Sequence, residues 1–149
     1  MPIIGGRGAG VRGLGFQGAA APNQVSGLTA TDFGTGRAYD NGRIDLSWTA
    51  PANNGATITG YLIERSTDGS SYSTLVANTG TSATTYSDTG LSSAQIYYYK
   101  VSAINAVGTG ESSDAANATA TTVPQAPTIG TATDGDAQAT VTYTAEATG

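Results

Sequence analysis

The chain has 149 residues, of which 38% are hydrophobic and only 11% are charged, and its net charge is −5. This acidic balance argues against a nucleic-acid binder and against a polybasic membrane anchor. The sequence contains no Cys and no His, which excludes a disulfide framework, a cysteine nucleophile and a histidine base or zinc ligand. No apolar run approaches the roughly 20 residues of a membrane-spanning helix, so we expect no membrane insertion.

Residues 1–22 form a basic, glycine-rich leader. Seven glycines lie between positions 5 and 18, and each interior glycine costs about 1 kcal/mol of helix stability relative to alanine. No strand pattern replaces the missing helix. We therefore interpret the leader as an extended arm that docks on a partner, where Arg7 and Arg12 would meet carboxylates or carbonyl groups. The apolar anchors of this arm would be Val11, Leu14 and Phe16.

The arm also contains the spacing GxGxxG at residues 8–13. In dinucleotide-binding proteins this motif follows a strand and opens a helix. Here no hydrophobic strand precedes the motif, and no helix-forming stretch follows it. The sequence therefore predicts no nucleotide cofactor.

Apolar and polar residues follow a period of two from residue 25 onward. Three runs carry this pattern, at residues 44–49, 61–65 and 97–103. Clusters typical of turns lie between such runs, at residues 51–55, 68–71 and 88–90. Short runs rich in β-branched and aromatic residues between turn clusters indicate an antiparallel sandwich or barrel. No stretch shows helical periodicity.

Four segments occur in an order and spacing that resemble a fibronectin type III domain. They are LSWTAP at residues 46–51, ITGYLIER at residues 58–65, Leu91, and YYYKVSAINAVG at residues 97–108. The resemblance covers residues 23–123, two thirds of the chain, and implies an all-β, seven-strand antiparallel sandwich. The loop at residues 33–43 is longer than the family usually has between its first two strands.

On such a sandwich, Trp48 lies on the second strand and fills the space between the sheets, opposite Tyr61. The rest of the expected core comes from the same strand faces: Ile44, Leu46, Ile63, Tyr86, Tyr99, Val101 and Ala103. Tyr97 follows Leu91 at the spacing of the family's tyrosine corner. Its hydroxyl is therefore expected to bond the backbone near Leu91.

Residues 124–149 begin a weak repeat of the first domain. The strings PTIGTAT and ATVTYTA echo residues 25–31 and 43–50, and Tyr143 takes the position of Trp48. Two strands cannot bury a core, so either the natural chain continues or these strands add to a neighbour. We favour a continuing chain, with a linker and the first strands of a second, incomplete fibronectin type III-like domain.

Two pairs of charged residues could carry chemistry. Asp134 and Asp136 flank a glycine and could hold Ca²⁺, but the further ligands of a calcium loop are missing, and Asp-Gly is typical of a hairpin turn. Glu64 and Lys100 are expected to form a surface cross-strand pair rather than a catalytic one. We expect no catalytic residue, no metal site and no cofactor.

Leu62 and Tyr98 are expected side by side on the outer face of the sandwich. An outward aromatic residue is equally consistent with ordinary β-propensity and with a contact spot for a sugar or a protein. The pair is therefore a candidate contact face.

The combination of a Gly-rich leader and a Ser/Thr-rich fibronectin module resembles tail, fibre and decoration proteins of tailed phages. This resemblance implies a non-enzymatic virion protein on the particle surface or tail, outside the cell, that serves assembly, decoration or adhesion. The implied partners are capsid, neck, baseplate or tail subunits in a multi-copy or homo-oligomeric assembly. A glycan or protein on the host surface is a further candidate partner. The alternative is a spacer or carbohydrate-contacting accessory module of a secreted bacterial glycosidase or adhesin.

Overall fold

The computed structural model describes residues 18–34, 42–122, 128–135 and 138–144. Within these ranges the regular elements are strands, as the period of two predicts, and no helix forms there. They are β1 (Ser26–Asp32), β2 (Gly42–Thr49), β3 (Ile58–Ser66), β4 (Ser73–Val76), β5 (Thr85–Leu91), β6 (Ile96–Asn105), β7 (Ala116–Thr119), β8 (Thr128–Gly135) and β9 (Gln138–Thr144).

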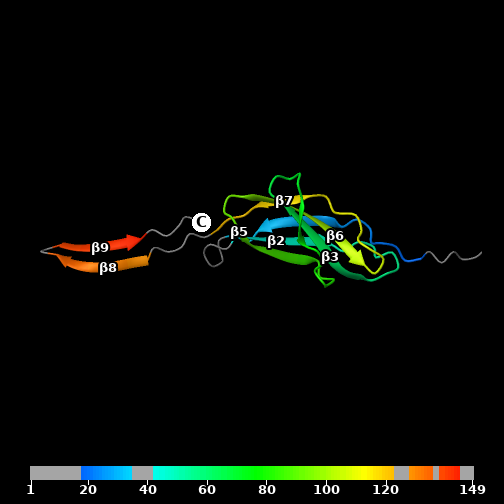
Figure 1. Ribbon diagram of the computed structural model, residues 1–149, viewed down its shortest axis with the longest axis horizontal. Coiled ribbons are helices and arrows are strands. Elements are labelled where there is room, and N and C mark those ends of the chain that lie inside the picture. Colours follow the sequence, from blue (N-terminus) through cyan, green and yellow to red (C-terminus); the bar gives the residue numbers. More distant parts are fainter. Residues whose placement is uncertain (1–17, 35–41, 123–127, 136–137, 145–149) are drawn as a thin grey trace, which may run out of the picture.

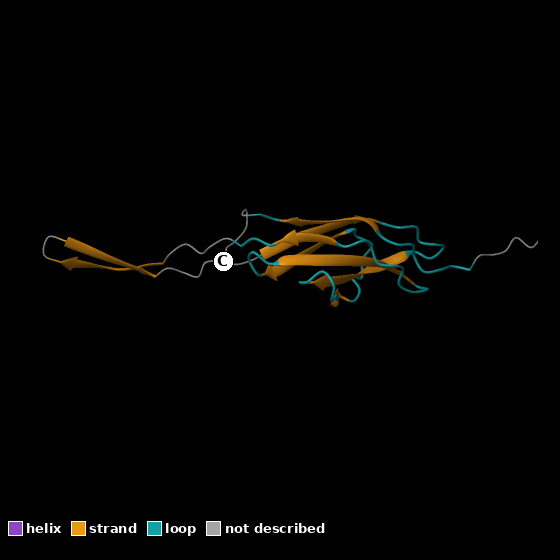
Figure 2. Cartoon of the chain, turned by 90° about the horizontal axis from the view of Figure 1, so that it is seen from above, coloured by secondary structure: helices purple, strands orange, loops and turns teal. Residues whose placement is uncertain are grey.

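Seven of these strands form two sheets that face one another (Figure 1). One sheet has the strand order β1-β2-β5, and the other has the order β4-β3-β6-β7, with antiparallel neighbours throughout. Figure 2 shows the two layers from above. β8 and β9 pair with each other in a separate sheet. The predicted seven-strand, all-β sandwich is confirmed.

The alternation along β2 shows why the sequence forms this sandwich. Ile44, Leu46 and Trp48 are buried, whereas Asp45 and Ser47, which lie between them, are more exposed. Successive side chains of a strand point to opposite faces of its sheet. One face of β2 therefore supplies the core and the other meets solvent.

Trp48 and Tyr61 lie at the centre of the core, as predicted. Their ring centroids are 5.0 Å apart with an interplanar angle of 68°, an edge-to-face arrangement that aromatic pairs favour. The buried residues around them include Ile44, Leu46, Ile63, Tyr97, Tyr99, Val101 and Ala103. Tyr86 packs against this cluster but is only partly buried, since its strand, β5, is at the edge of its sheet.

The tyrosine corner forms where the sequence places it. The Ser92 N–H donates a hydrogen bond of 3.1 Å to the Tyr97 hydroxyl, one residue beyond Leu91. The Ala94 N–H donates to the Ala120 carbonyl at 2.9 Å. These bonds fix the turn between β5 and β6 to the end of the sandwich.

Of the predicted turn clusters, residues 68–71 form a turn and residues 88–90 do not. The Asp68 carboxylate accepts hydrogen bonds from the N–H groups of Ser70 and Ser71, at 2.8 and 2.7 Å. Residues 88–90 instead belong to β5. The turn prediction there was wrong because the Asp88 side chain points into the sandwich, where other side chains bond it.

Several predicted features lie outside the described residues. They include the arm up to residue 17, residues 35–41 of the long loop, and Asp136. Asp134 and Gly135 end β8, and Gly135 pairs with Gln138 at the start of β9. This pairing agrees with a hairpin turn at that point.

Candidate interaction surfaces

Residues 18–24 lie along one end of the sandwich, over the β2–β3 and β6–β7 loops. The Ala20 N–H donates to the Asn54 carbonyl, and the Asn23 N–H donates to the Ala52 carbonyl, both at 3.0 Å. The Asn54 amide in turn donates to the Ala21 carbonyl at 2.8 Å. The last part of the predicted arm is thus bonded to the sandwich.

The buried side chain of Asn105 joins this segment to both loops. Its Nδ2 donates to the carbonyls of Ala20 at 2.7 Å and Asn53 at 3.0 Å. Its Oδ1 accepts from the N–H groups of Val107 at 2.9 Å and Gly108 at 3.1 Å. We refer to residues 18–24, together with Asn54 and Asn105, as the N-terminal clamp.

Replacing Asn105 with alanine is expected to loosen the N-terminal clamp. The change leaves carbonyl and N–H groups without their partners, which costs about 1–3 kcal/mol of unfolding free energy. The amide protons of Ala20 and Asn23 should therefore exchange with solvent roughly fivefold faster or more. Hydrogen exchange measured by NMR checks this expectation.

Asn117→Ala is a matched control, because Asn117 is an exposed residue of β7. It should leave the exchange rates of both amides unchanged. Equal rates in the Asn105 variant and the control would contradict the assigned role of Asn105.

The outer face of the four-stranded sheet carries Leu62 and Tyr98, but they are not side by side. Leu62 is opposite Ser102, whereas Tyr98 is opposite Ser66 at the far end of the β3–β6 pairing. Both side chains are half-buried. The prediction of a single contact spot was therefore wrong. The strand register places the two residues at separate positions on one face.

Glu64 and Lys100 are opposite one another on this face, as predicted. The Lys100 ammonium, however, lies over the Tyr72 ring, 4.5 Å from its centroid. The ion pairs among the described residues do not include Glu64 and Lys100. The cross-strand position was predicted correctly, but the cation interacts with an aromatic ring instead of the carboxylate.

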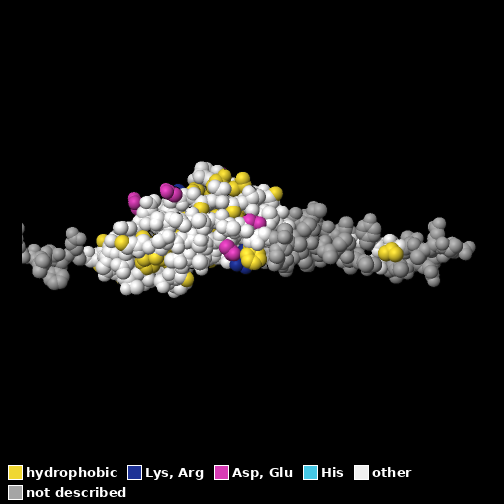
Figure 3. Space-filling view, turned by 180° about the vertical axis from the view of Figure 1, so that it is seen from behind, with side chains coloured by type: hydrophobic (Ala, Val, Ile, Leu, Met, Phe, Trp, Pro, Cys, Tyr) yellow, Lys and Arg dark blue, Asp and Glu magenta, His cyan; other side chains and the backbone are white. Residues whose placement is uncertain are grey.

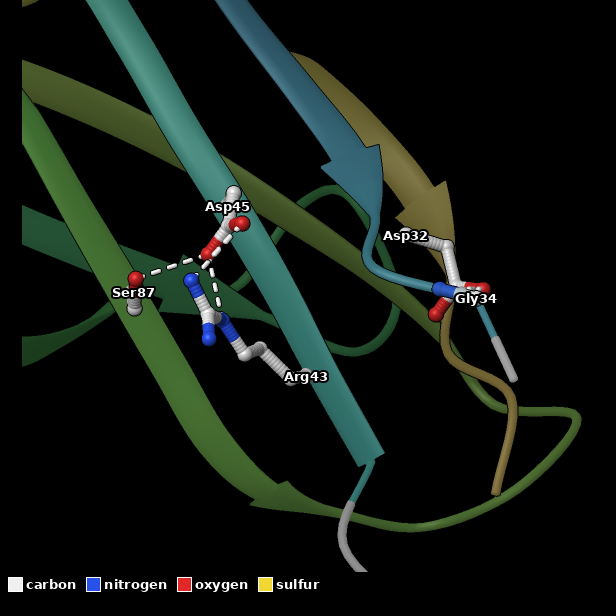
Figure 4. A network of polar contacts seen from close by, with 5 residues as sticks. All are labelled: Asp32, Gly34, Arg43, Asp45 and Ser87. Carbon is white, nitrogen blue, oxygen red and sulfur yellow. Dashed lines mark hydrogen bonds and ion pairs between the residues drawn. The ribbon is translucent and has the colours of Figure 1, made fainter. Parts of the chain in front are cut away.

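The outer face of the three-stranded sheet carries an ion pair (Figure 4). Arg43 Nε and Nη2 donate to the two Asp45 carboxylate oxygens at 2.7 and 3.0 Å, and the Ser87 hydroxyl lies 2.7 Å from Asp45 Oδ1. The Arg43 guanidinium also lies 4.1 Å from the centroid of the Phe33 ring. A shallow groove of about 310 Å³ borders the ion pair.

Two carboxylates are expected to make the stability of the sandwich depend on pH. The hydrogen bond from Arg43 lowers the pKa of Asp45. Backbone N–H groups of Ser71 and Ser70 lower the pKa of Asp68. A carboxylate with a lowered pKa in the folded state stabilises that state when the pH is above its unfolded pKa, about 3.9. This stabilisation is lost as the pH falls through the folded pKa.

The urea midpoint of the chain is therefore expected to stay level from about pH 7 to pH 5 and to fall below about pH 4. In the Asp45→Asn, Asp68→Asn double variant this fall should be shallower, because the titrating groups are gone. Identical acid profiles for the two proteins would show that other carboxylates cause the fall.

A buried polar network was not predicted from the sequence. Asp88 is 4% exposed, and its Oδ2 accepts hydrogen bonds of 2.9 Å from both Arg65 Nη1 and the Tyr99 hydroxyl. Burial, followed by the nearby Asp88 charge, raises the pKa of Tyr99. The network connects β3, β5 and β6 inside the sandwich.

Among the described residues, no three Asp or Glu side chains gather in a way that could hold a metal ion. Figure 3 shows charged side chains scattered over a mostly uncharged surface on one face of the molecule. None of the described residues form a helix that is long and apolar enough to cross a membrane.

Comparison with known proteins agrees with this architecture. A family model described as fibronectin type III domain matches residues 25–119. The chain is similar to an Fn3-like protein from Clostridium thermocellum, with 31% identity, a TM-score of 0.50 and coverage of 66% of this chain and 92% of that one. It is also similar to the sixth fibronectin type III domain of human fibronectin type III domain containing protein 3, with 24% identity, a TM-score of 0.55 and coverage of 76% and 97%.

A longer structure, titin kinase and its flanking domains, matches with 22% identity and a TM-score of 0.55. The match covers 67% of this chain but only 17% of the titin chain. At this identity the likeness concerns the fold alone. The family match is consistent with the two-sheet topology and the tyrosine corner. The chain belongs to the fibronectin type III domain family.

Proposed function

We propose that this chain is a non-enzymatic structural protein of a phage virion. It is anchored through its N-terminal arm and displays the fibronectin type III sandwich for assembly, decoration or host-surface adhesion. The observation that carries the proposal is the N-terminal clamp. Because residues 18–24 are bonded to the sandwich, the segment before residue 18 is attached at one defined end of the domain.

The sandwich has the properties of a displayed module. The aromatic residues at the centre of its core, Trp48, Tyr61 and Tyr99, are buried, and fibronectin type III domains are typically non-catalytic modules. The arm instead combines many glycines with apolar and cationic side chains: Arg7, Val11, Arg12, Leu14 and Phe16. Such a segment loses roughly 1–2 kcal/mol per ordered backbone residue, so it needs a partner surface to become ordered.

The proposed partners are other virion proteins, namely capsid, neck, baseplate or tail subunits, in a multi-copy assembly on the particle surface or tail. The outer sheet face around Leu62 and Tyr98 remains the candidate for contacts with a host-surface glycan or protein. The two roles use different parts of the chain, so they can be tested separately.

Deletion of residues 1–17 tests the proposal. The truncated chain keeps the N-terminal clamp and should remain folded, which near-ultraviolet circular dichroism of the buried aromatic residues would verify. It should fail to co-sediment with particles of the phage that encodes it, whereas the full chain co-sediments.

A Leu62→Ala, Tyr98→Ala chain is the matched comparison and should be incorporated at the normal level. Normal incorporation of the truncated chain would overturn the anchoring role. Loss of incorporation only in the double variant would move the attachment surface to the sheet face.

A further inference from the structure

Four strand pairs of the β8–β9 hairpin repeat the register of the β1–β2 hairpin. In β1–β2, Ser26 is opposite Thr49 and Ala30 is opposite Leu46. In β8–β9, the equivalent pairs are Thr128 with Thr144 and Ala132 with Val141. The pair of Asp134 with Ala139 likewise corresponds to Asp32 with Ile44, and β8–β9 extends one pair further, to Gly135 with Gln138.

The two hairpins also share an irregularity. The register shifts between Ser26 and Thr29 in β1 and between Ile129 and Ala132 in β8. In both hairpins the shift lies between the first and the second of the matched pairs. Their connections differ, with residues 33–41 between β1 and β2 but only residues 136–137 between β8 and β9. β8–β9 is thus built as the first hairpin of a fibronectin type III sandwich.

In the complete sandwich, other strands cover the equivalent hairpin. β5 pairs with the second edge of β2, and the four-stranded sheet faces Leu46, which is 1% exposed. In the described part of the chain, β9 has β8 as its strand neighbour. Val141, at the register position of Leu46, is 52% exposed. The place beside β9 that corresponds to β5 fits an added strand.

Charge complementarity favours the arm of another copy as the strand that adds beside β9. Residues 124–149 contain three acidic and no basic residues, whereas residues 1–22 contain Arg7 and Arg12 and no acidic residue. Two such hairpins would repel one another, and an arm and a hairpin would attract.

The arm also has the side-chain pattern of an added edge strand. Leu14 and Phe16 alternate with Gly13 and Gly15, so an extended backbone would place both large side chains on one face. β5 shows the same one-sided arrangement, because its buried Asp88 and partly buried Tyr86 are two positions apart. The arm is too rich in glycine to form a strand alone, and an existing strand edge supplies the missing hydrogen-bond partners.

The attachment points of the arm and the hairpin favour pairing between copies. The N-terminal clamp holds residues 18–24 at the end where β1 begins. At the other end of β1, Asp32 accepts hydrogen bonds from the Thr121 N–H at 3.0 Å and the Thr121 hydroxyl at 2.6 Å. Residues 18–24 and Thr121 therefore lie at opposite ends of the sandwich, which favours a head-to-tail contact between copies.

We propose that residues 11–17 of one copy add as a strand to β9 of a second copy, with Leu14 and Phe16 covering the face of Val141. In this pairing Arg7 and Arg12 would meet the acidic residues of the hairpin, Asp134 and Asp136. This inference rests on the proposed function, in which the arm is the docking segment, and names its partner as a second copy of the chain.

Two complementary truncations test this contact. Residues 18–149 retain the hairpin without the arm, and residues 1–122 retain the arm without the hairpin. Both retain the buried core residues of the part of the chain that the structure describes, because these lie between Val25 and Ala120. Analytical ultracentrifugation should show each truncated chain as a monomer alone, a 1:1 complex in the mixture, and concentration-dependent association of the full chain.

Charge reversal supplies the matched control. Arg7→Glu, Arg12→Glu in residues 1–122 should weaken the complex by about tenfold at low salt. Asp134→Lys, Asp136→Lys in the other truncated chain should restore it. Absence of a complex in the mixture would overturn the proposal, as would a full chain that stays monomeric while the truncated chains associate, since the arm would then pair within one copy.

Particle incorporation separates this inference from the proposed function. If deletion of residues 1–17 abolishes incorporation but the mixture forms no complex, the arm docks on a different virion protein and the copy-to-copy contact is refuted. If the complex forms but the deletion leaves incorporation normal, the anchoring role is refuted and the contact between copies stands.

Discussion

Replacing Trp48 with alanine is expected to lower the free energy of unfolding by about 3–5 kcal/mol. The indole is 6% exposed and contacts the Tyr61 ring edge to face. Its Nε1 has no hydrogen-bond partner in the described part of the chain, so the loss comes from apolar burial and packing rather than from a broken hydrogen bond. Urea unfolding followed by far-ultraviolet circular dichroism measures it.

Val107→Ala provides the control for this measurement. Val107 is 53% exposed in the β6–β7 loop, and substitution at such a position changes stability by about 0.5 kcal/mol or less. A Trp48→Ala protein as stable as the control would contradict the central place of Trp48 in the core.

Replacing Asp88 with alanine is expected to cost about 2–4 kcal/mol of unfolding free energy. The change leaves the buried Tyr99 hydroxyl without its acceptor and the Arg65 guanidinium without its counter-charge. The Arg65 side chain is 33% exposed, so water replaces part of the lost interaction and keeps the cost below that of a fully buried ion pair. Urea unfolding at pH 7 measures the effect.

Two further variants separate the contributions. Tyr99→Phe removes one hydrogen bond and should cost about 1 kcal/mol. Asp45→Ala removes the surface ion pair with Arg43 and should cost less than about 1 kcal/mol. If Asp88→Ala cost no more than Asp45→Ala, the buried network would have no special role in stability.

The core was predictable because burial repeats with the period of the strands. Ile44, Leu46 and Trp48 share one face of β2, and the family motif aligned them with Tyr61 and Ile63 on the opposite sheet. Both signals are local in the sequence. They determine which face of a strand is buried without requiring knowledge of its neighbours.

Features that depend on pairs distant in the sequence were not predictable in the same way. Asp88 and Arg65 are 23 residues apart, and Asn105 and Ala20 are 85 apart. Asp88 next to Thr89 and Gly90 has the composition of a turn, and Asn105 has that of a loop residue. Tertiary contacts decide both roles. The separation of Leu62 from Tyr98 likewise depends on strand register, which composition does not encode.

The central claim, that the arm anchors the displayed sandwich, is tested most directly by transferring the arm. Residues 1–17 would be fused ahead of the human fibronectin type III domain that matches this chain, and the chimera's occupancy on phage particles would be measured by quantitative immunoblot. The account predicts occupancy near that of the full chain, with none for the human domain alone. A chimera left entirely in the supernatant, with residues 18–149 bound normally, would contradict it.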